Sequence, residues 1–384
     1  NTYLVVLNNG NNFQGSLTVE GSIFNQGYIR LFGADMTVTE SGWITNKGAI
    51  ETGMMLTEKP TVTVGGLLEN ASTGIVDMTA ADFVLEENGV MQNNLAGGNL
   101  GTVKGVPVSQ QTLFSEITDD QAQLQKLIDK VRNDGYHAGY FWISSDLHIT
   151  STVIIPANIT LAVQNTFSLT IDPNVVVENK GRMVVEQGGN LNVDGILAFT
   201  EGSVDLRGTM TVAPYGQVSL GQSGQINVAE SGSLINKGYF GLECGTINGN
   251  IDNRGTVSVT WIEGNVGKVN GSFLSGADRV DLYMPFNDVA PDHDEADIQT
   301  MLAYAAENSI NRITVHFTRD YTFVNDFTVP QNMTFVVGAY RNDDEFSGTT
   351  VTIPAGKTLT INGTVQVAKK SALVIEGNAA LNST

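Results

Sequence analysis

Short runs of alternating apolar and polar residues recur along the whole chain, for example at residues 16–19, 210–212 and 256–259. Alternation with many β-branched residues predicts short strands that bury one face. A strand of three to five residues cannot stand alone, because its backbone edges and its apolar face both need a neighbour. The pattern therefore predicts strands that stack on one another in a repeating structure.

Glycines divide these runs at a regular interval. A glycine, a variable residue and an apolar residue follow one another roughly every seven residues between Gly189 and Gly255, and the same pattern occurs between Gly15 and Gly48. Three such intervals make a coil of about 20 residues with three short strands. The sequence therefore predicts an all-β fold, a parallel β-helix.

Asn-x-Gly triplets mark the expected corners of the coils. Asparagine and glycine tolerate positive φ, so each triplet predicts a tight corner, and amide side chains on successive coils could form a hydrogen-bonded ladder. A set of unrelated hairpin turns is the alternative. The asparagines of these triplets are Asn25, Asn46, Asn179, Asn236 and Asn253.

The alternation also predicts which residues point into the core. We expect these to be Leu191, Val193, Ile226, Val228, Leu234, Ile251, Val257 and Val259. Replacing Val228 by Asp would then bury an unpaired charge and cost several kcal/mol.

A longer repeat is superimposed on the coils. Residues 120–163 align without gaps on residues 294–337. Each segment opens with an apolar stripe at helical spacing after acidic residues, which predicts short amphipathic cap helices at about 120–133 and 294–307. The predicted stripes are Leu124, Leu127 and Ile128, and Ile298, Met301 and Leu302. Three parts follow from this repeat: the end of a first unit at 1–113, a second unit at 114–286 and the start of a third at 287–384.

The order of helix, strand and a segment of the form apolar-Pro-x-Asn-apolar-Thr resembles the start of the pectin lyase-like superfamily. The residues that carry the likeness are Pro156, Asn158 and Thr160, and Pro330, Asn332 and Thr334. The resemblance implies a right-handed β-helix with a helix that covers its first coil. It says little about function, because that superfamily includes lyases, hydrolases, phage tailspikes and adhesins.

Composition narrows the choice of partners. The chain has 42 glycines but is 41% hydrophobic, which argues against disorder, and its formal charge is −20. Such a charge repels nucleic acids and anionic lipids, so we expect neither as a partner. No run is long and apolar enough for a membrane-spanning helix, and no membrane insertion is predicted. The chain opens without a signal peptide and directly on a strand pattern, so we expect an excised piece of a longer secreted or bacterial cell-surface protein.

Catalytic motifs are not found. The polygalacturonase motifs of the superfamily have no counterpart on the coils, where Arg182, Arg207 and Arg254 are expected to stand apart from paired acids. The acid pairs Glu201 with Asp205 and Glu186 with Asp194 could serve glycoside hydrolysis, but solvated surface carboxylates are the favoured interpretation. We predict no catalytic residues.

Metal chemistry is not predicted either. The histidines His137, His148, His293 and His316 lack ligand spacing, and Cys244 is expected to be a small buried core residue. The acidic cluster Asp292, Asp294, Glu295 and Asp297 could hold calcium, but helix capping explains it better, and no cofactor is predicted.

Aromatic residues near the glycine-rich corners are the candidate carbohydrate-binding residues. An exposed ring can stack on a sugar, although rings inside the coils are an equal alternative. The candidates are Tyr28, Trp43, Tyr215, Tyr239 and Trp261.

We therefore expect a non-catalytic structural or adhesive module of a large secreted or cell-surface protein. Its partners would be a polysaccharide or host surface glycan, bound along the side of the coils, and neighbouring repeats of the same longer chain. A polysaccharide lyase or glycoside hydrolase with a divergent site is the first alternative, and a phage tailspike-like protein is the second.

Overall fold

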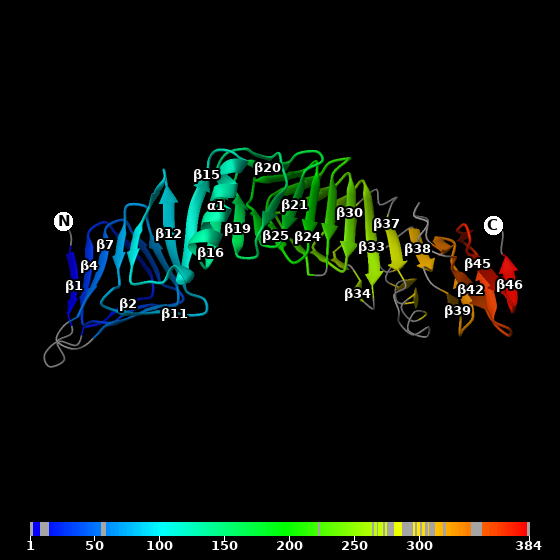
Figure 1. Ribbon diagram of the computed structural model, residues 1–384, viewed down its shortest axis with the longest axis horizontal. Coiled ribbons are helices and arrows are strands. Elements are labelled where there is room, and N and C mark those ends of the chain that lie inside the picture. Colours follow the sequence, from blue (N-terminus) through cyan, green and yellow to red (C-terminus); the bar gives the residue numbers. More distant parts are fainter. Residues whose placement is uncertain are drawn as a thin grey trace. The chain divides into compact units, whose positions relative to one another are not determined.

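A computed structural model describes residues 3–7, 15–54, 59–221, 223–262, 265–266, 268–271, 273–274, 280–285, 295, 298–299, 302–303, 306, 312–317, 320–338 and 348–381. Its contacts form two compact units: unit 1 comprises residues 1–147 with 158–162, and unit 2 comprises residues 148–157 with 163–384. Stacked parallel strands form a β-solenoid of about 22 residues per turn (Figure 1). The predicted all-β fold and its coil length are confirmed. The hand of the coil and the three-part division of the chain stay predictions.

The strands of unit 1 belong to three sheets, and successive coils add parallel strands to them. The first sheet contains β1 (Tyr3–Leu7), β4 (Tyr28–Phe32), β7 (Ala49–Gly53), β10 (Ile75–Asp77) and β14 (Thr102–Lys104). The second contains β2 (Leu17–Val19), β5 (Met36–Val38), β8 (Thr61–Val64) and β11 (Asp82–Leu85). The third contains β3 (Ser22–Asn25), β6 (Trp43–Asn46), β9 (Leu67–Asn70), β12 (Val90–Ala96), β15 (Gln111–Ile117), β16 (Ala138–Ile143) and β19 (Ile159–Val163). A short strand, β13 (Asn99–Leu100), pairs antiparallel with β12, and the 3-10 helix η1 (Val108–Gln110) precedes β15.

Unit 2 also consists of parallel strands in stacked coils. Its first sheet contains β17 (Leu147–Ile149), β20 (Ser168–Ile171), β23 (Asn190–Val193), β26 (Thr209–Val212), β29 (Ser233–Asn236), β32 (Ile251–Asn253) and β36 (Phe273–Leu274). Its second contains β18 (Val153–Ile155), β21 (Val176–Asn179), β24 (Ile196–Phe199), β27 (Gln217–Leu220), β30 (Tyr239–Glu243), β33 (Thr256–Ile262), β37 (Val280–Pro285), β38 (Arg312–Phe317), β41 (Met333–Val337) and β44 (Thr364–Val367), with β34 (Asn265–Val266) antiparallel to β33. Its third contains β22 (Arg182–Val185), β25 (Ser203–Leu206), β28 (Gln225–Val228), β31 (Thr246–Asn248) and β35 (Lys268–Asn270). Two small sheets follow: β39 (Tyr321–Thr322), β42 (Thr350–Ile353) and β45 (Ala372–Ile375), and β40 (Phe327–Val329), β43 (Thr358–Ile361) and β46 (Asn378–Leu381).

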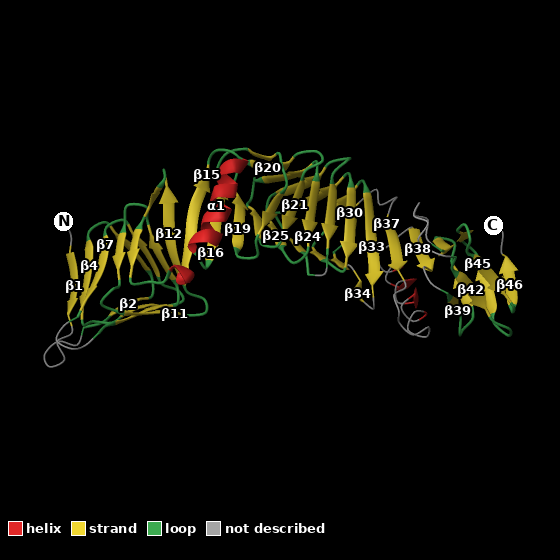
Figure 2. Cartoon of the chain, in the orientation of Figure 1, coloured by secondary structure: helices red, strands yellow, loops and turns green. Residues whose placement is uncertain are grey.

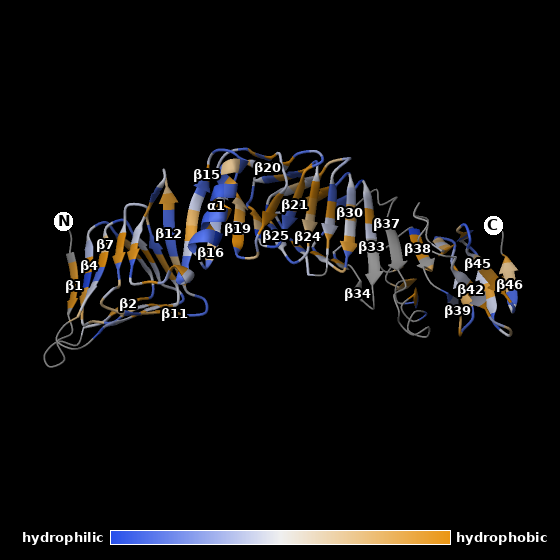
Figure 3. Ribbon diagram, viewed as in Figure 1, coloured by the Kyte–Doolittle hydropathy of each residue, from blue (hydrophilic) through white to orange (hydrophobic). Residues whose placement is uncertain are grey.

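The core lies inside the coils, where every second residue of a strand meets its counterpart on the next coil. Hydrophobic and hydrophilic positions alternate along the strands (Figure 3). In-register parallel pairing keeps all apolar positions of a sheet on one face. The predicted core residues that are confirmed as buried are Leu191, Val193, Ile226, Leu234, Ile251 and Val257. The side chain of Val259 lies outside the described part of the chain.

Val228 is the exception among the predicted core residues. It pairs with the buried Leu206 and therefore has the inward register, but its side chain is only partly buried. On the next coil the chain turns at Gly249, which has no side chain, and a Cβ built there would lie 2.7 Å from the Cβ of Val228. Gly249 therefore leaves Val228 without a covering side chain on the next coil, and Val228→Asp should cost less than expected. Ile226→Asp, at a fully buried position, is the sharper test of the inward register.

Buried amide side chains form the predicted ladder in part. In unit 1, Nδ2 of Asn25 donates to Oδ1 of Asn46 at 2.7 Å, and Asn46 donates to Asn70 at 2.9 Å. In unit 2, Asn236 donates to Asn253 at 2.8 Å. Asn179 does not join a ladder, because Phe199 occupies the matching position on the next coil.

The glycines of these corners are needed for a different reason from the one expected. None of Gly48, Gly238 and Gly255 has a positive φ. A Cβ on Gly48 would instead lie 2.0 Å from the carbonyl oxygen of Gly27, and one on Gly255 would lie 2.3 Å from that of Gly238. The corner therefore selects glycine because the backbones of successive coils touch there.

The first predicted helix is confirmed as α1 (Gln121–Asp134), which packs on β15 and β16 within unit 1 (Figure 2). The carboxylate of Asp120 accepts hydrogen bonds from the backbone N–H groups of Ala122 and Gln123, and the helix ends at Gly135 with a φ of 77°. Its apolar stripe is buried, namely Leu124, Leu127, Ile128 and Val131. The chain thus leaves β15, forms α1 and returns to pair β16 with β15.

The long repeat is visible in the strand bounds. The strands β16, β18 and β19 at 138–143, 153–155 and 159–163 have counterparts in β38, β40 and β41 at 312–317, 327–329 and 333–337. The offset of 174 residues is the one that the sequence alignment gives. The second predicted helix, 294–307, lies mostly outside the described residues, as does its stripe residue Met301, but Ile298 is buried.

Candidate functional site

The described candidate carbohydrate-binding residues are divided between the two units. Trp43 begins β6 and is 49% exposed, Tyr239 begins β30 and is 39% exposed, and Tyr215 is 98% exposed in the turn before β27. Tyr28 begins β4 and is partly buried, with Cζ of Arg30 at 5.3 Å from its ring centroid. The remaining candidate, Trp261, falls in β33, but its side chain is outside the described residues. Tyr28 and Trp43 therefore lie on different sheets of unit 1, whereas Tyr215 and Tyr239 lie on adjacent coils of unit 2, where Tyr239 pairs with Gln217.

A polar network occupies the outward face of the third sheet in unit 1. The two carboxylate oxygens of Glu69 accept hydrogen bonds from Oγ1 of Thr45 and Nδ2 of Asn94, each at 2.9 Å. Nε2 of Gln92 donates to Oδ1 of Asn94 at 2.9 Å. These side chains come from the neighbouring strands β6, β9 and β12, so the network fixes planar polar groups across three coils.

Aromatic residues lie on both sides of this network, on the same face. Trp43 and Phe24, which is 57% exposed, lie on β6 and β3, and Nζ of Lys47 is 5.2 Å from the centroid of the Phe24 ring. On the other side β15 and β16 carry three rings in mutual contact: Phe114, Tyr140 and Trp142. We name these three rings the aromatic platform.

The sequence alone did not identify the platform. A strand was expected after the first helix, and the outward phase of Tyr140 and Trp142 in that strand follows from their alternation with Phe141 and Ile143, which are buried. Phe114 lies far from them in sequence, because α1 is inserted between the paired strands. The contact among the three rings therefore requires knowledge of the strand pairing.

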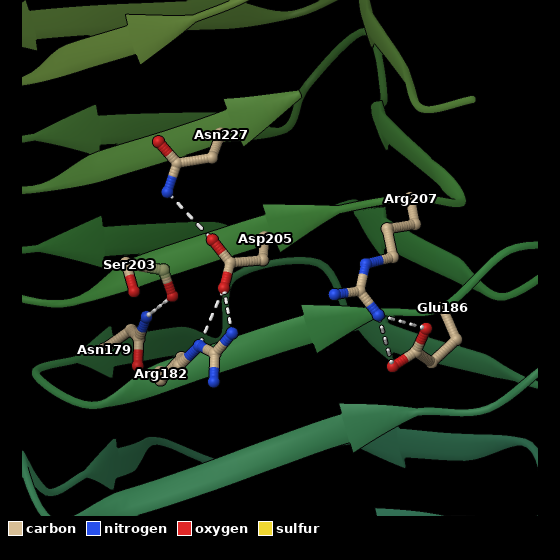
Figure 4. A network of polar contacts seen from close by, with 7 residues as sticks. All are labelled: Asn179, Arg182, Glu186, Ser203, Asp205, Arg207 and Asn227. Atoms are coloured by element: carbon tan, nitrogen blue, oxygen red, sulfur yellow. Dashed lines mark hydrogen bonds and ion pairs between the residues drawn. The ribbon is translucent and has the colours of Figure 1, made fainter. Parts of the chain in front are cut away.

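Unit 2 carries a polar ladder on the outward face of its third sheet (Figure 4). Nε of Arg182 donates to Asp205 at 2.7 Å, and Nδ2 of Asn227 donates to the other carboxylate oxygen of Asp205 at 2.8 Å. The series continues from Asn248 to Asn227 and from Asn270 to Asn248, each at 2.8 Å. We name this series, Arg182, Asp205, Asn227, Asn248 and Asn270, the lateral ladder.

From the sequence, the arginines of the coils were expected to stand apart from paired acids, but the structure pairs each of them with an acid. Arg182 pairs with Asp205, Arg207 pairs with Glu186 at 3.1 Å, and Arg254 pairs with Asp252. The hydrogen bond from Arg254 lowers the pKa of Asp252. A residue one coil away in space is about 22 positions away in sequence, so local inspection missed two of these pairs. The arginines hold Asp205 and Glu186, two of the acids considered above for glycoside hydrolysis.

Metal and thiol chemistry receive no support from the described residues. Within them, no group of three or more His, Cys, Asp or Glu side chains is arranged to hold a metal ion. Cys244 is only partly buried, at a corner with a φ of 74°, so its expected place in the core is wrong. Burial and then the Glu243 carboxylate raise the pKa of its thiol.

Glu295, from the acidic cluster that was weighed as a calcium site, is a buried structural carboxylate. It accepts hydrogen bonds from the backbone N–H of Val324 at 2.6 Å, from Nδ2 of Asn325 at 2.8 Å and from the Tyr321 hydroxyl at 3.3 Å. These donors tie residue 295 to β39 and to the loop after it. The other members of the cluster, Asp292, Asp294 and Asp297, lie outside the described residues.

No family model matches the chain, and no curated protein matches it. A solved structure to which it is similar is the crystal structure of a TibC-catalysed hyper-glycosylated fragment of TibA. The two chains are 12% identical, the match covers 100% of this chain and 96% of that chain, and the TM-score is 0.17, too low to support any inference. No helix among the described residues combines the length and apolar composition needed to span a bilayer.

Proposed function

We propose that this chain is a non-catalytic adhesive module of a secreted or cell-surface protein, and that it binds glycans along the outward sides of its coils. The lateral ladder is the observation that carries the proposal. Its amides repeat once per coil, about 4.8 Å apart. One N–H of each amide donates to the neighbouring side chain, and the second N–H can donate to a ligand. Weak polar contacts repeated in this way add up along a linear ligand.

The state of the outward carboxylates supports a role without catalysis. Glycoside hydrolysis and lyase chemistry need an acid and a base, or a metal, free to act a few ångströms from the reacting bond. On the described faces Glu69 is held by Thr45 and Asn94, and Asp205 by Arg182 and Asn227. The oxygens of these two carboxylates accept hydrogen bonds from side chains of adjacent coils and so help to hold the coils together. The proposal includes a pectin lyase-like fold. The repeat of strands at an offset of 174 residues supports it.

The test is a glycan array with short and long members of neutral and acidic oligosaccharide series, followed by calorimetry on the best ligand. We expect affinity to rise with ligand length, because longer chains reach more rungs. Asn248→Ala should weaken the binding of long ligands several-fold, since each lost hydrogen bond is worth about 0.5–1.5 kcal/mol. Gln187→Ala, an exposed amide at a corner of unit 2, is the matched control and should bind as the wild type does.

Incubation of the purified protein with pectic, xylan and glucan substrates completes this test. We expect no release of reducing or unsaturated ends. Release of either product would overturn the non-catalytic proposal and favour the lyase or hydrolase alternative. Binding that saturates with a monosaccharide would contradict the lateral mode. A trimeric mass by light scattering would favour the tailspike-like alternative.

A further inference from the structure

We infer that the aromatic platform of Phe114, Tyr140 and Trp142 is a stacking subsite for the face of a neutral sugar ring. The inference rests on the proposed function and assigns it a place in unit 1. The platform lies on the outward side of β15 and β16, where the register pairs Phe114 with Tyr140 and Glu116 with Trp142.

The three rings form a patch and are not part of the core. The Phe114 and Tyr140 ring centroids are 5.7 Å apart with planes only 13° apart, and the Trp142 ring lies 5.9 Å and 5.8 Å from them. The inward positions of the same strands are filled by buried residues, among them Leu113, Phe141 and Ile143. Each platform ring remains partly exposed, although its size and apolarity would favour full burial.

The rim of the platform supplies hydrogen-bonding groups at fixed positions. Asn94 pairs in register with Phe114, and Glu69 and Gln92 hold its amide in place. Glu116 is exposed beside Trp142. An aromatic floor with preset planar polar groups at its edge suits a pyranose, which offers C–H bonds on its face and hydroxyls around its rim.

The charge around the platform selects among sugars. Glu116 is a carboxylate beside Trp142, Glu69 lies on β9, two strands from β15, and the chain as a whole has a formal charge of −20. Uronic acids and sulfated sugars would be repelled, so the occupant is a neutral sugar. The indole N–H of Trp142 is buried and has no hydrogen-bond partner among the described residues, so the sugar meets the face of the ring.

The experiment uses the fluorescence of Trp142 as its reporter. The chain has three tryptophans, so the double variant Trp43→Phe with Trp261→Phe leaves Trp142 as the only one. Cellohexaose and chitohexaose are the neutral probes, and hexagalacturonic acid is the acidic one. We expect the neutral probes to shift the emission of Trp142 and the acidic probe to leave it unchanged.

Substitutions made in the wild-type chain locate the subsite by calorimetry. Tyr140→Ala should weaken neutral probes about tenfold, the order expected when one aromatic stack is lost, and Tyr140→Phe should retain most of the affinity. Val84→Ala is the matched control, because Val84 is an apolar residue, 45% exposed, on the second sheet of the same unit. Circular dichroism of each variant separates loss of binding from loss of folding.

The outcomes distinguish the two proposals. If neutral glycans bind but Trp142 emission does not respond and Tyr140→Ala binds normally, the platform is overturned while glycan binding by the coils stands. Binding of acidic probes alone would also overturn the platform and leave the lateral ladder as the binding surface. If no glycan of the array or of the three probes binds at millimolar concentration, the platform and the proposed glycan binding both fail.

Discussion

Buried amide side chains connect the coils of unit 1 residue by residue. From Asn25 through Asn46 and Asn70 to Asn93, each Nδ2 donates to the Oδ1 of the next coil, at distances from 2.7 to 3.3 Å. The same nitrogen of Asn46 lies 2.9 Å from the backbone carbonyl of Ile75. An asparagine in this position therefore satisfies a corner and a neighbouring coil together, which an apolar residue cannot do.

The ladder predicts that its middle rung is costly to remove. Asn46→Ala should lower the free energy of unfolding by about 1–3 kcal/mol, because it leaves the amides of Asn25 and Asn70 buried without one of their partners. Urea denaturation followed by circular dichroism measures this. Gln26→Ala, an exposed amide in the adjacent corner, should stay within about 0.5 kcal/mol of the wild type. Equal midpoints for the two variants would show that the ladder contributes nothing to stability.

The sequence predicted the positions of several corner asparagines, but it did not predict which asparagines join the ladder. Asn-x-Gly triplets located Asn46 and Asn236 correctly, since a triplet is a local pattern. Asn70 and Asn93 belong to the same ladder without a following triplet, and Asn179 has a triplet without a ladder. An asparagine joins the ladder only if an adjacent coil has an amide side chain at the paired position. The sequence of a single coil does not contain that information.

At the scale of elements, α1 is the best predicted part of the chain. Its N-terminal carboxylate and its apolar stripe are both local signals, and the structure confirms each of them. Its neighbour Gly139 could not be interpreted from sequence. A Cβ there would lie 2.7 Å from Cδ1 of Ile159 and 2.9 Å from Cγ2 of Val131, so glycine lets α1 approach β16 closely.

The packing of α1 can be tested through its stripe. Leu127 is 4% exposed, so Leu127→Ala should lower the free energy of unfolding by about 2–5 kcal/mol through lost burial and a residual cavity. Lys126→Ala, at an exposed position of the same helix, should be close to neutral, because alanine is a good helix former. Thermal unfolding of both variants decides the matter. A Leu127→Ala protein as stable as the Lys126→Ala protein would mean that the stripe does not hold α1 to the coils.

At the scale of the whole molecule, amino-acid composition determines the net charge, and the pairing of strands determines which side chains come together in the candidate sites. The chain carries 40 acidic and 20 basic residues. Contacts between adjacent coils, such as Arg30 with Glu51 and Arg182 with Asp205, neutralise some of the acids. The solenoid itself follows from local alternation and glycine spacing. The lateral ladder and the aromatic platform follow only from strand register, which is why sequence analysis selected aromatics near glycine-rich corners, such as Tyr215, and did not select Phe114 or Tyr140.

The charge balance predicts that salt stabilises this protein near neutral pH. Ion pairs such as Arg207 with Glu186 are exposed, so each contributes about 0–1 kcal/mol and little stability is lost when salt screens it. Repulsion among the excess carboxylates acts over longer distances, and it weakens strongly as the Debye length falls from about 30 Å at 0.01 M salt to about 3 Å at 1 M. The midpoint of thermal unfolding should therefore rise with NaCl, by about 2–4 °C for each kcal/mol of relieved repulsion. The control is the same series near the isoelectric point of 4.4, where the net charge vanishes and the salt effect should shrink. A midpoint that falls with salt near neutral pH would show that the ion pairs between coils outweigh the repulsion, and an equal rise at both pH values would assign the effect to hydrophobic burial.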